Sequence, residues 1–263
     1  MEVDLSSLLP TNSSVPIYSI RKITQTLHDS ISRVATGLKV LGGNDASSHS
    51  MGNTLIAQSK SFRAAENNTQ QGIELLELAE SALLELNALA NRLKELGVAD
   101  TLSTNTTNDT AALNAEASAV SDTIDSIVSS LTFNSLNVLG TSSRTFSVGI
   151  DGNGNTQTVK STIGITATDI TDATNSNNSA DTTLGEITQS LGNISGGLTA
   201  LQAYQNVASS SSATLLEAAS NLQDTDFAAE TAKIAKQSLL KNYALAMVVH
   251  ANNEEIEKLK LLA

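Results

Sequence analysis

Apolar residues recur three or four residues apart in long stretches of this chain, and this spacing constrains the fold more than any other feature. The clearest stretch covers about Thr54 to Val98. Alternating spacings of four and three mark the a and d positions of a heptad repeat, which form a stripe on one side of a helix. Its members are Leu75, Ala79, Ala82, Leu86, Leu89, Leu93 and Leu96. Because one helix cannot cover its own stripe, the sequence predicts partner helices.

Two later stretches repeat the pattern after a Thr/Asn/Asp-rich break at 100–110. The first contains Ala117, Val120, Ile124, Ile127 and Leu131, and the second contains Leu184, Ile187, Leu191, Ile194, Leu198 and Leu201. Three such stripes in one chain can cover each other as a helical bundle. Between them, Arg144 to Ile170 alternates apolar with polar residues around an Asp-Gly-Asn-Gly turn, which predicts a β-hairpin. The Ser/Asn/Asp/Thr-rich segment from Thr171 to Thr183 is interpreted as an exposed loop.

The two ends of the chain predict further helices, at about Ile17 to Leu41 and Ala228 to Leu262. Pro16 favours a helix start, and Gly42-Gly43 favours a stop. In an antiparallel chain both terminal helices reach the same pole and can pair, but a pair leaves apolar surface for neighbouring copies to cover. The predicted self-assembly residues are Ile20, Ile23, Leu27, Ile31, Val34, Leu38, Leu41, Leu239, Ala246, Ile256 and Leu259.

The expected fold is therefore mainly α: an elongated antiparallel helical bundle or coiled coil with one β-hairpin and with terminal helices that pair at one pole. We expect an N-terminal assembly helix and a C-terminal assembly helix that flank the bundle. The expected divisions are 1–45 for the first assembly helix, 46–140 for bundle helices, 141–183 for the hairpin and loop, 184–226 for the return helix and 227–263 for the second assembly helix.

Composition excludes several classes of function. The net charge of −12 argues against a nucleic-acid partner, because such partners are bound by Lys and Arg. No apolar window is long enough to cross a bilayer, so we expect no membrane insertion, and the first twenty residues contain no signal-peptide stretch. The chain has no Cys, which excludes disulfides and thiolate metal sites.

No catalytic, metal or cofactor site is expected. The three histidines, His28, His49 and His250, are far apart and form no His-Glu-x-x-His motif. The glycines of the predicted turn lack the Lys-Ser/Thr of a phosphate loop. Several glutamates of the heptad helix occupy solvent-facing positions, which favours a solvated face over paired catalytic carboxylates.

Motifs at both ends of the chain are similar to those of bacterial flagellins. The N-terminal motif is Ser-Arg-Val-Ala-Thr-Gly-Leu-Lys-Val at 32–40, followed by Asn-Asp-Ala at 44–46. The C-terminal motif is Gln-Asp-Thr-Asp-Phe-Ala-Ala-Glu at 223–230, and it is the most specific. On these motifs, which extend over nearly the whole chain, the chain resembles the flagellin family.

This resemblance implies a non-catalytic subunit that polymerises into an extracellular motility filament. It further implies export through the flagellar secretion channel, with a cap protein, hook-associated proteins and an export chaperone as partners. The terminal helices would form the inner tube, and the large variable outer domains of many flagellins would be missing. Arg92, Leu96 and Glu116 align with family positions that contact an innate immune receptor. The favoured interpretation is a heptad core role for Leu96, and surface charge or pairing between subunits for the other two.

Two other functions stay open from the sequence. A hook–filament junction protein would share the terminal helices but assemble as a single ring layer. A secreted helical effector or binding module would be a monomer whose ends are ordered or dispensable. Indefinite growth from seeds separates the filament subunit from the junction protein, and a truncation lacking residues 1–45 that kept full activity would favour the effector or binding module.

Overall fold

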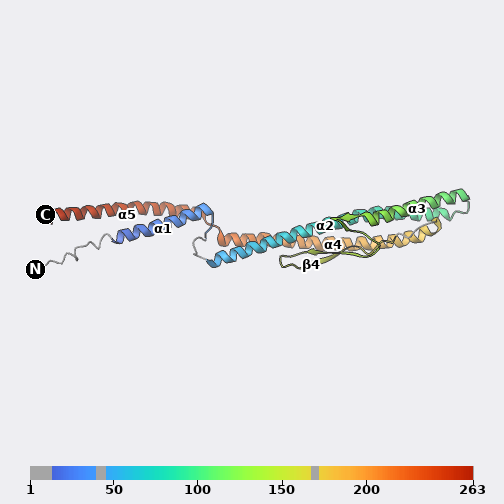
Figure 1. The fold of residues 1–263 in the computed structure, drawn as a ribbon, viewed down its shortest axis with the longest axis horizontal. Helices are drawn as coiled ribbons and strands as arrows, with labels where there is room; N and C mark the ends of the chain where they lie inside the picture. The colour runs from blue at the N-terminus through green and yellow to red at the C-terminus, as the bar shows by residue number, and fades with distance from the viewer. Residues whose placement is uncertain (1–13, 40–45, 167–171, 263) are drawn as a thin grey trace. The chain divides into compact units, whose positions relative to one another are not determined.

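The computed structural model describes residues 14–39, 46–166 and 172–262. Its elements are five helices and four short strands. The helices are α1 (Ser14–Thr36), α2 (Ala46–Asp100), α3 (Thr107–Ser130), α4 (Ala173–Gln223) and α5 (Phe227–Leu262). The strands are β1 (Thr132–Phe133), β2 (Leu136–Asn137), β3 (Arg144–Gly149) and β4 (Thr156–Thr162). Figure 1 shows their order along the chain, and the prediction of a mainly α fold with a helical bundle and a hairpin is confirmed.

The chain divides into two compact units. Unit 1 comprises Met1–Ile56 and Leu216–Ala263, and unit 2 comprises Ala57–Leu215. Unit 1 therefore contains α1, α5, the start of α2 and the end of α4, while unit 2 contains α3, both hairpins and most of α2 and α4. No helix in the described part of the chain is long and apolar enough to span a membrane.

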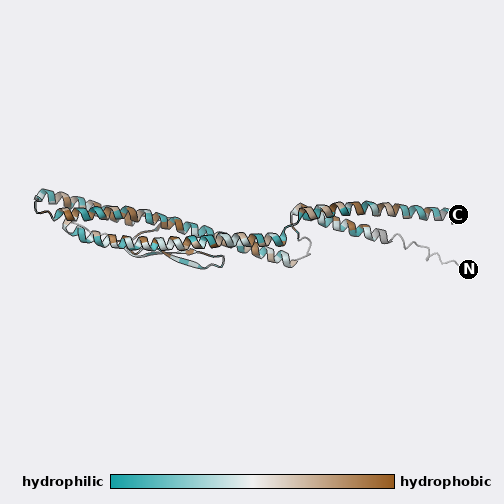
Figure 2. Cartoon of the chain, turned by 180° about the vertical axis from the view of Figure 1, so that it is seen from behind, coloured by the Kyte–Doolittle hydropathy of each residue, from teal (hydrophilic) through white to brown (hydrophobic). Residues whose placement is uncertain are grey.

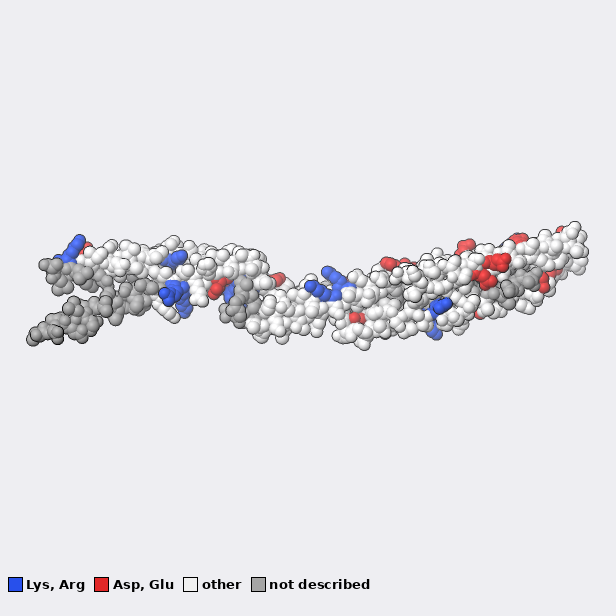
Figure 3. All heavy atoms as spheres, viewed as in Figure 1, with Lys and Arg blue, Asp and Glu red and all other residues white. Residues whose placement is uncertain are grey.

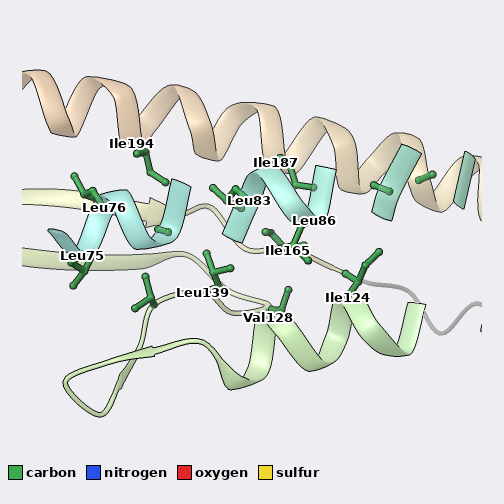
Figure 4. Packing of buried hydrophobic residues seen from close by; sticks show 14 of the residues in the cluster. Leu75, Leu76, Leu83, Leu86, Ile124, Val128, Leu139, Ile165, Ile187 and Ile194 are labelled. Atoms are coloured by element: carbon green, nitrogen blue, oxygen red, sulfur yellow. The ribbon is translucent and has the colours of Figure 1, made fainter. Parts of the chain in front are cut away.

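The core of unit 2 lies where α2, α3, α4 and the segments beside the hairpin meet (Figure 4). Its largest fully buried side chains include Leu76, Leu83, Leu86, Ile124, Leu139, Ile165, Ile187 and Ile194. The predicted stripes of α3 and α4 all lie in this core or pack against it. On α2 the burial is wider than one stripe: Leu83 and Ala90 are fully buried, whereas Ala82 and Leu89 are only half-buried. Several elements contact α2, so more than two heptad positions are covered.

The predicted hairpin is confirmed as the antiparallel pair β3 and β4, in which Phe146 lies opposite Val159 and Gly149 lies opposite Thr156. Its turn is held by Asp151, whose Oδ1 accepts hydrogen bonds from the backbone N–H groups of Asn153 and Asn155, both at 2.9 Å. Of the two turn glycines, only Gly154 has a positive φ, of 88°. The turn therefore depends on the Asp151 carboxylate as much as on glycine.

A second small antiparallel pair, β1 with β2, was not predicted. The residues between these strands, Asn134 and Ser135, have positive φ values of 48° and 65°. Two consecutive positive φ values are typical of a type I′ hairpin turn. The sequence signal is weak because each strand has only two residues and serine rarely adopts this conformation.

The interpretation of 171–183 as an exposed loop is wrong, because α4 already begins at Ala173. Small residues at heptad spacing, Ala173, Ser176, Ala180 and Thr183, are buried there and continue the stripe of larger residues that follows. Ser176 donates to the carbonyl of Leu93 at 3.0 Å. Packing of small side chains against α2 therefore overrides the low helix propensity of Ser, Asn and Thr.

Candidate self-assembly surface

The terminal helices α1 and α5 pack against each other in unit 1. They run antiparallel: Arg33, near the end of α1, lies beside Glu230, near the start of α5, and Lys22 and Thr26 line a groove with Gln237. The prediction that the terminal helices pair is thus met within unit 1. The pair is also joined by a polar contact, because Arg33 of α1 bonds Glu230 of α5 at 3.3 Å. Lys233, also in α5, bonds the same carboxylate at 2.8 Å.

Helix α1 ends earlier than its apolar pattern predicts. Gly37 adopts a φ of 72°, and its N–H donates to the carbonyl of Arg33 at 2.8 Å. A glycine in the left-handed region is a common helix terminator, so α1 stops at Thr36 and the predicted stop at Gly42-Gly43 is wrong. Leu38 consequently lies outside the helix, in an isolated bridge with Asp224, and Leu41 lies outside the described residues.

The connections that leave α1 and α4 are joined by backbone hydrogen bonds. The N–H of Thr225 donates to the carbonyl of Gly37 at 2.9 Å, and the N–H of Lys39 donates to the carbonyl of Gln223 at 2.7 Å. The buried Gln223 side chain donates to Asn53 at 3.1 Å. These contacts fix the starting point of α5, whose first turn is capped by Asp226 through the N–H groups of Ala228 and Ala229.

The remaining self-assembly residues of α1 form its partly covered stripe. Ile20, Ile23, Leu27 and Val34 are half-buried, and Ile31 is exposed. The pairing with α5 therefore covers the α1 stripe only in part. Apolar surface of this kind favours association.

Among the side chains of helix α5 that the structure describes, more large apolar residues are exposed than buried. Half-buried positions occur at a spacing of three or four, at Ile234, Gln237, Lys241, Ala244, Val248 and Ala251. The exposed set is Phe227, Leu239, Leu240, Tyr243, Leu245, Met247, Val249 and Ile256. Figure 2 shows hydrophobic residues, in brown, along much of this helix. A helix that is apolar on most sides is typical of one that other chains surround.

The predicted residues of α5 all belong to its uncovered side where they are described. Leu239, Ala246 and Ile256 are exposed, while the side chain of Leu259 lies outside the described residues. The heptad reading missed Tyr243, Met247 and Val249, and also Tyr18 of α1, which are similarly exposed. The signal was present in the sequence, because apolar residues in α5 exceed the two positions per heptad that one seam needs.

Residues 12–143 match the bacterial flagellin N-terminal helical region. A flagellin of Halalkalibacterium halodurans is 30% identical over 247 residues, which cover 88% of this chain and 89% of that protein. The chain belongs to the bacterial flagellin family. A flagellar filament core protein of Brachyspira hyodysenteriae is 25% identical and is aligned over 90% of this chain and 92% of its own length.

The flagellin family membership identifies the chain as a structural subunit of the extracellular bacterial flagellar filament, and the junction-protein alternative is not favoured. The crystal structure of Bacillus cereus flagellin aligns with 60% of this chain and 93% of its own, at 22% identity and a TM-score of 0.39. The sequence relatives establish the family.

The three residues that the resemblance predicts as an immune-receptor contact lie in unit 2. Arg92 donates to Glu116 through Nε at 2.8 Å and through Nη2 at 2.6 Å, so α2 and α3 are joined by a surface ion pair. The pKa of Arg92 is raised, chiefly by the hydrogen bond to Glu116. Leu96 is buried, with 2% of its surface exposed. The structure thus brings the two charged residues together and places Leu96 in the flagellin core.

Proposed function

We propose that this flagellin polymerises by burying the exposed apolar surface of α5, together with the half-buried stripe of α1, against neighbouring copies. The observation that carries the proposal is the exposure of the large apolar side chains of α5. Burial of such surface contributes about 25 cal/mol per Å², and the antiparallel partner α1 is too narrow to provide it. Neighbouring copies around a filament axis would supply the missing contacts.

Seeded polymerisation of α5 variants tests this proposal. We expect L239E and I256E each to raise the critical concentration for growth at least about ten-fold, because a buried leucine contributes roughly 1.5–3 kcal/mol. A matched control is L102E, since Leu102 is as exposed as Leu239 (61% and 59%) but lies in unit 2. Equal growth of L239E, I256E and L102E would contradict the proposal, whereas loss of growth in L102E alone would move the contact surface to unit 2.

Unlimited growth also separates a filament subunit from a junction protein. A chain that adds only one layer to seeds would give short particles of constant length, whereas a filament subunit lengthens with the supply of monomer. Electron microscopy of seeds after increasing growth times measures this directly. Particles that stop lengthening while monomer remains would favour the junction protein.

Secretion and the flagellar partners also belong to the proposal. We infer that the chain leaves the cell through the flagellar export channel and that a cap protein, hook-associated proteins and an export chaperone act on it. The uncovered apolar side of α5 supports a chaperone, because such a surface promotes association before export. Co-purification of the chaperone with wild-type chain but not with L239E would support this point.

Contact with an innate immune receptor stays a prediction for Arg92, Leu96 and Glu116. The Arg92–Glu116 pair is exposed and accessible to a partner, while the buried Leu96 would act by supporting the surface above it. Binding of purified monomer to the receptor ectodomain, compared with R92A and E116A variants, tests this. Unchanged binding in both variants would reject the site.

A further inference from the structure

One face of α2 in unit 2 is exposed along its length. Two series of residues spaced seven apart are exposed there. Because seven residues make nearly two helical turns, the members of each series lie on the same side of the helix. The first series is Lys60, Asn67, Glu74 and Ser81, and the second is Arg63, Gln70, Glu77 and Leu84. We call these eight residues the α2 face. Its charges are segregated, with two cations at one end and two glutamates further along.

The hairpin β3–β4 covers the opposite side of α2. Gly72 lies two residues from Glu74, which is about 200° of helix rotation. A Cβ at Gly72 would lie only 2.9 Å from Val148 of β3, so the hairpin and α2 are in close contact there. Ser61 of α2 donates to the carbonyl of Gly152 in the hairpin turn at 2.7 Å.

The outer side of the hairpin is the second exposed face of unit 2. Side chains of a strand alternate between its two faces, and here Phe146, Val148 and Val159 point toward the helices. The residues that alternate with these along β3 and β4 and are exposed are Thr145, Ser147, Thr156, Thr158 and Lys160. We call these five residues, together with Asp151 in the turn, the hairpin face.

The two faces carry opposite charges at matching levels along the bundle. Gly152 lies beside Ser61 and Phe62 of α2. Asp151 directly precedes Gly152, so Asp151 is level with Lys60 and Arg63. At the other end, Gly197 of α4 lies against both Leu76 and Val159, so Lys160 is level with Glu77. The sign of charge on the hairpin face is thus the reverse of the sign on the α2 face at both levels.

The spacing of the charges agrees between the faces. Lys60 and Glu74 are fourteen residues apart, which is about 21 Å along a helix. Lys160 lies opposite Thr145, six residues from Asp151, which is about 20 Å along an extended strand. A copy placed beside another with little shift along the bundle would therefore match both pairs of charges.

In the part of the chain that the structure describes, the lysine, arginine and glutamate charges of the two faces are not paired with opposite charges, although Gln70 donates a hydrogen bond to Glu74 at 3.1 Å. Among the described residues, no ion pair includes Lys60, Arg63, Glu74, Glu77 or Lys160. The α2 face also places like charges three residues apart, at Lys60 and Arg63 and again at Glu74 and Glu77, which is mildly unfavourable in a single helix. Figure 3 shows that basic side chains of unit 2 lie in a few places on the face in view, with acidic side chains between and beyond them.

We propose that a second copy of this chain docks its hairpin face on the α2 face, with Lys160 beside Glu74 and Glu77 and with Asp151 beside Lys60 and Arg63. The contact joins two different faces, so it is head-to-tail and repeats from copy to copy without closing as a dimer. It rests on the proposed filament function and adds a lateral contact in unit 2 to the apolar contacts of α1 and α5. Charge matching of this kind sets the register between neighbours more than the strength of binding.

Charge reversal tests the contact in seeded polymerisation at low salt. We expect E74K/E77K and K160E each to raise the critical concentration about ten-fold, because attraction becomes repulsion, and E74K/E77K/K160E to return it to within about two-fold of wild type. The matched control is D122K/E217K, which makes the same charge change at exposed residues outside both faces. Circular dichroism of each monomer verifies that it folds.

Two outcomes would overturn the inference. In the first, E74K/E77K has the same critical concentration as the control; in the second, the triple variant has a critical concentration no lower than that of K160E. Either leaves the proposed function intact as long as wild-type chain polymerises and L239E raises the critical concentration as expected. Wild-type chain that fails to grow on seeds would instead contradict the proposed function itself.

Cross-linking provides a second, independent test, because the chain contains no cysteine. Asn67 and Thr156 lie between the two charge pairs on the opposite faces, and both are exposed. We expect filaments of N67C/T156C to form ladders of covalent oligomers on mild oxidation, and filaments of A88C/T156C to form none, because Ala88 lies three heptads further along α2. Equal ladders in both, or none in N67C/T156C, would overturn the register.

Discussion

Arg33 of α1 and Glu230 of α5 are joined across the terminal helix pair, with Nη1 donating to Oε1 at 3.3 Å. Glu230 is buried, and Lys233 donates to the same oxygen at 2.8 Å. The hydrogen bond from Lys233 is the largest influence that lowers the pKa of Glu230; burial opposes it, and bonds from Ser30 and Arg33 add to the lowering. Glu230 therefore couples the stability of the helix pair to pH.

The first prediction concerns this coupling. A carboxyl group whose pKa is lowered on folding stabilises the folded state above its ordinary pKa of about 4.3, and the stabilisation is lost as pH falls through the lower folded value. We expect E230Q to destabilise the α1–α5 pair by about 1 kcal/mol at neutral pH, since Lys233 is mostly solvated. Hydrogen exchange in α1 measures this, and the difference from wild type should vanish in acid. A difference that is constant with pH, or equal to that of the exposed control E217Q, would contradict it.

The second prediction concerns the end of α1 at Gly37. A side chain at a φ of 72° is strained, so we expect G37A to destabilise unit 1 by about 1 kcal/mol. Faster hydrogen exchange at Thr225, whose N–H donates to the Gly37 carbonyl, is the measurement. Gly185 provides the control, because an alanine there meets nothing within 4 Å and should stabilise α4 slightly. Unchanged exchange in G37A would show that the backbone tolerates the side chain.

The third prediction concerns the close approach of α2 and α4. A Cβ at Gly97 would lie 2.7 Å from the backbone nitrogen of Asn177, so the helices must separate to accept it. We expect G97A to lower the stability of unit 2 by about 1–3 kcal/mol in urea unfolding. The same change at Gly192, which faces open space on α4, should be neutral or stabilising. Equal midpoints for the two variants would argue against close packing at this end.

The fourth prediction compares two adjacent leucines. Leu83 is fully buried in the core, whereas 58% of Leu84 is exposed on the α2 face. We expect L83A to cost about 2–5 kcal/mol through lost burial and a cavity, and L84A to cost little in the monomer. Urea unfolding of both variants measures the difference. Comparable losses would mean that the sides of α2 are assigned incorrectly.

Spacing of large apolar residues predicted most of the bundle because burial in unit 2 depends on those residues. Ile124, Ile187 and Ile194 are buried as their heptad positions indicate. The hairpin was predictable for a similar reason, since alternation and turn chemistry agree. The start of α4 was not, because its buried residues are small and polar and give the same composition as a loop.

The candidate assembly surface was predictable only in outline. The apolar excess at both ends indicated that neighbouring copies must cover it, and Leu239 and Ile256 are exposed as that idea requires. Which side of α5 faces α1 could not be read from the sequence, because apolar residues occur around most of that helix. The charge reversal between the α2 face and the hairpin face needed the structure, because it depends on which residues lie level with one another.

The small buried residues at the start of α4 tolerate different substitutions from the large buried residues that follow. The small residues are Ala173, Ser176, Ala180 and Thr183. Near Ile187 and Ile194, smaller side chains would destabilise the packing of α4. Near Ser176, larger side chains would destabilise it, because Leu93 and Gly97 of α2 leave no room for them. A library of substitutions in α4 would therefore show that the buried positions change from preferring small to preferring large side chains within about three turns. During evolution, the buried side chains at the beginning of α4 must therefore stay small, whereas those further along the helix must stay large.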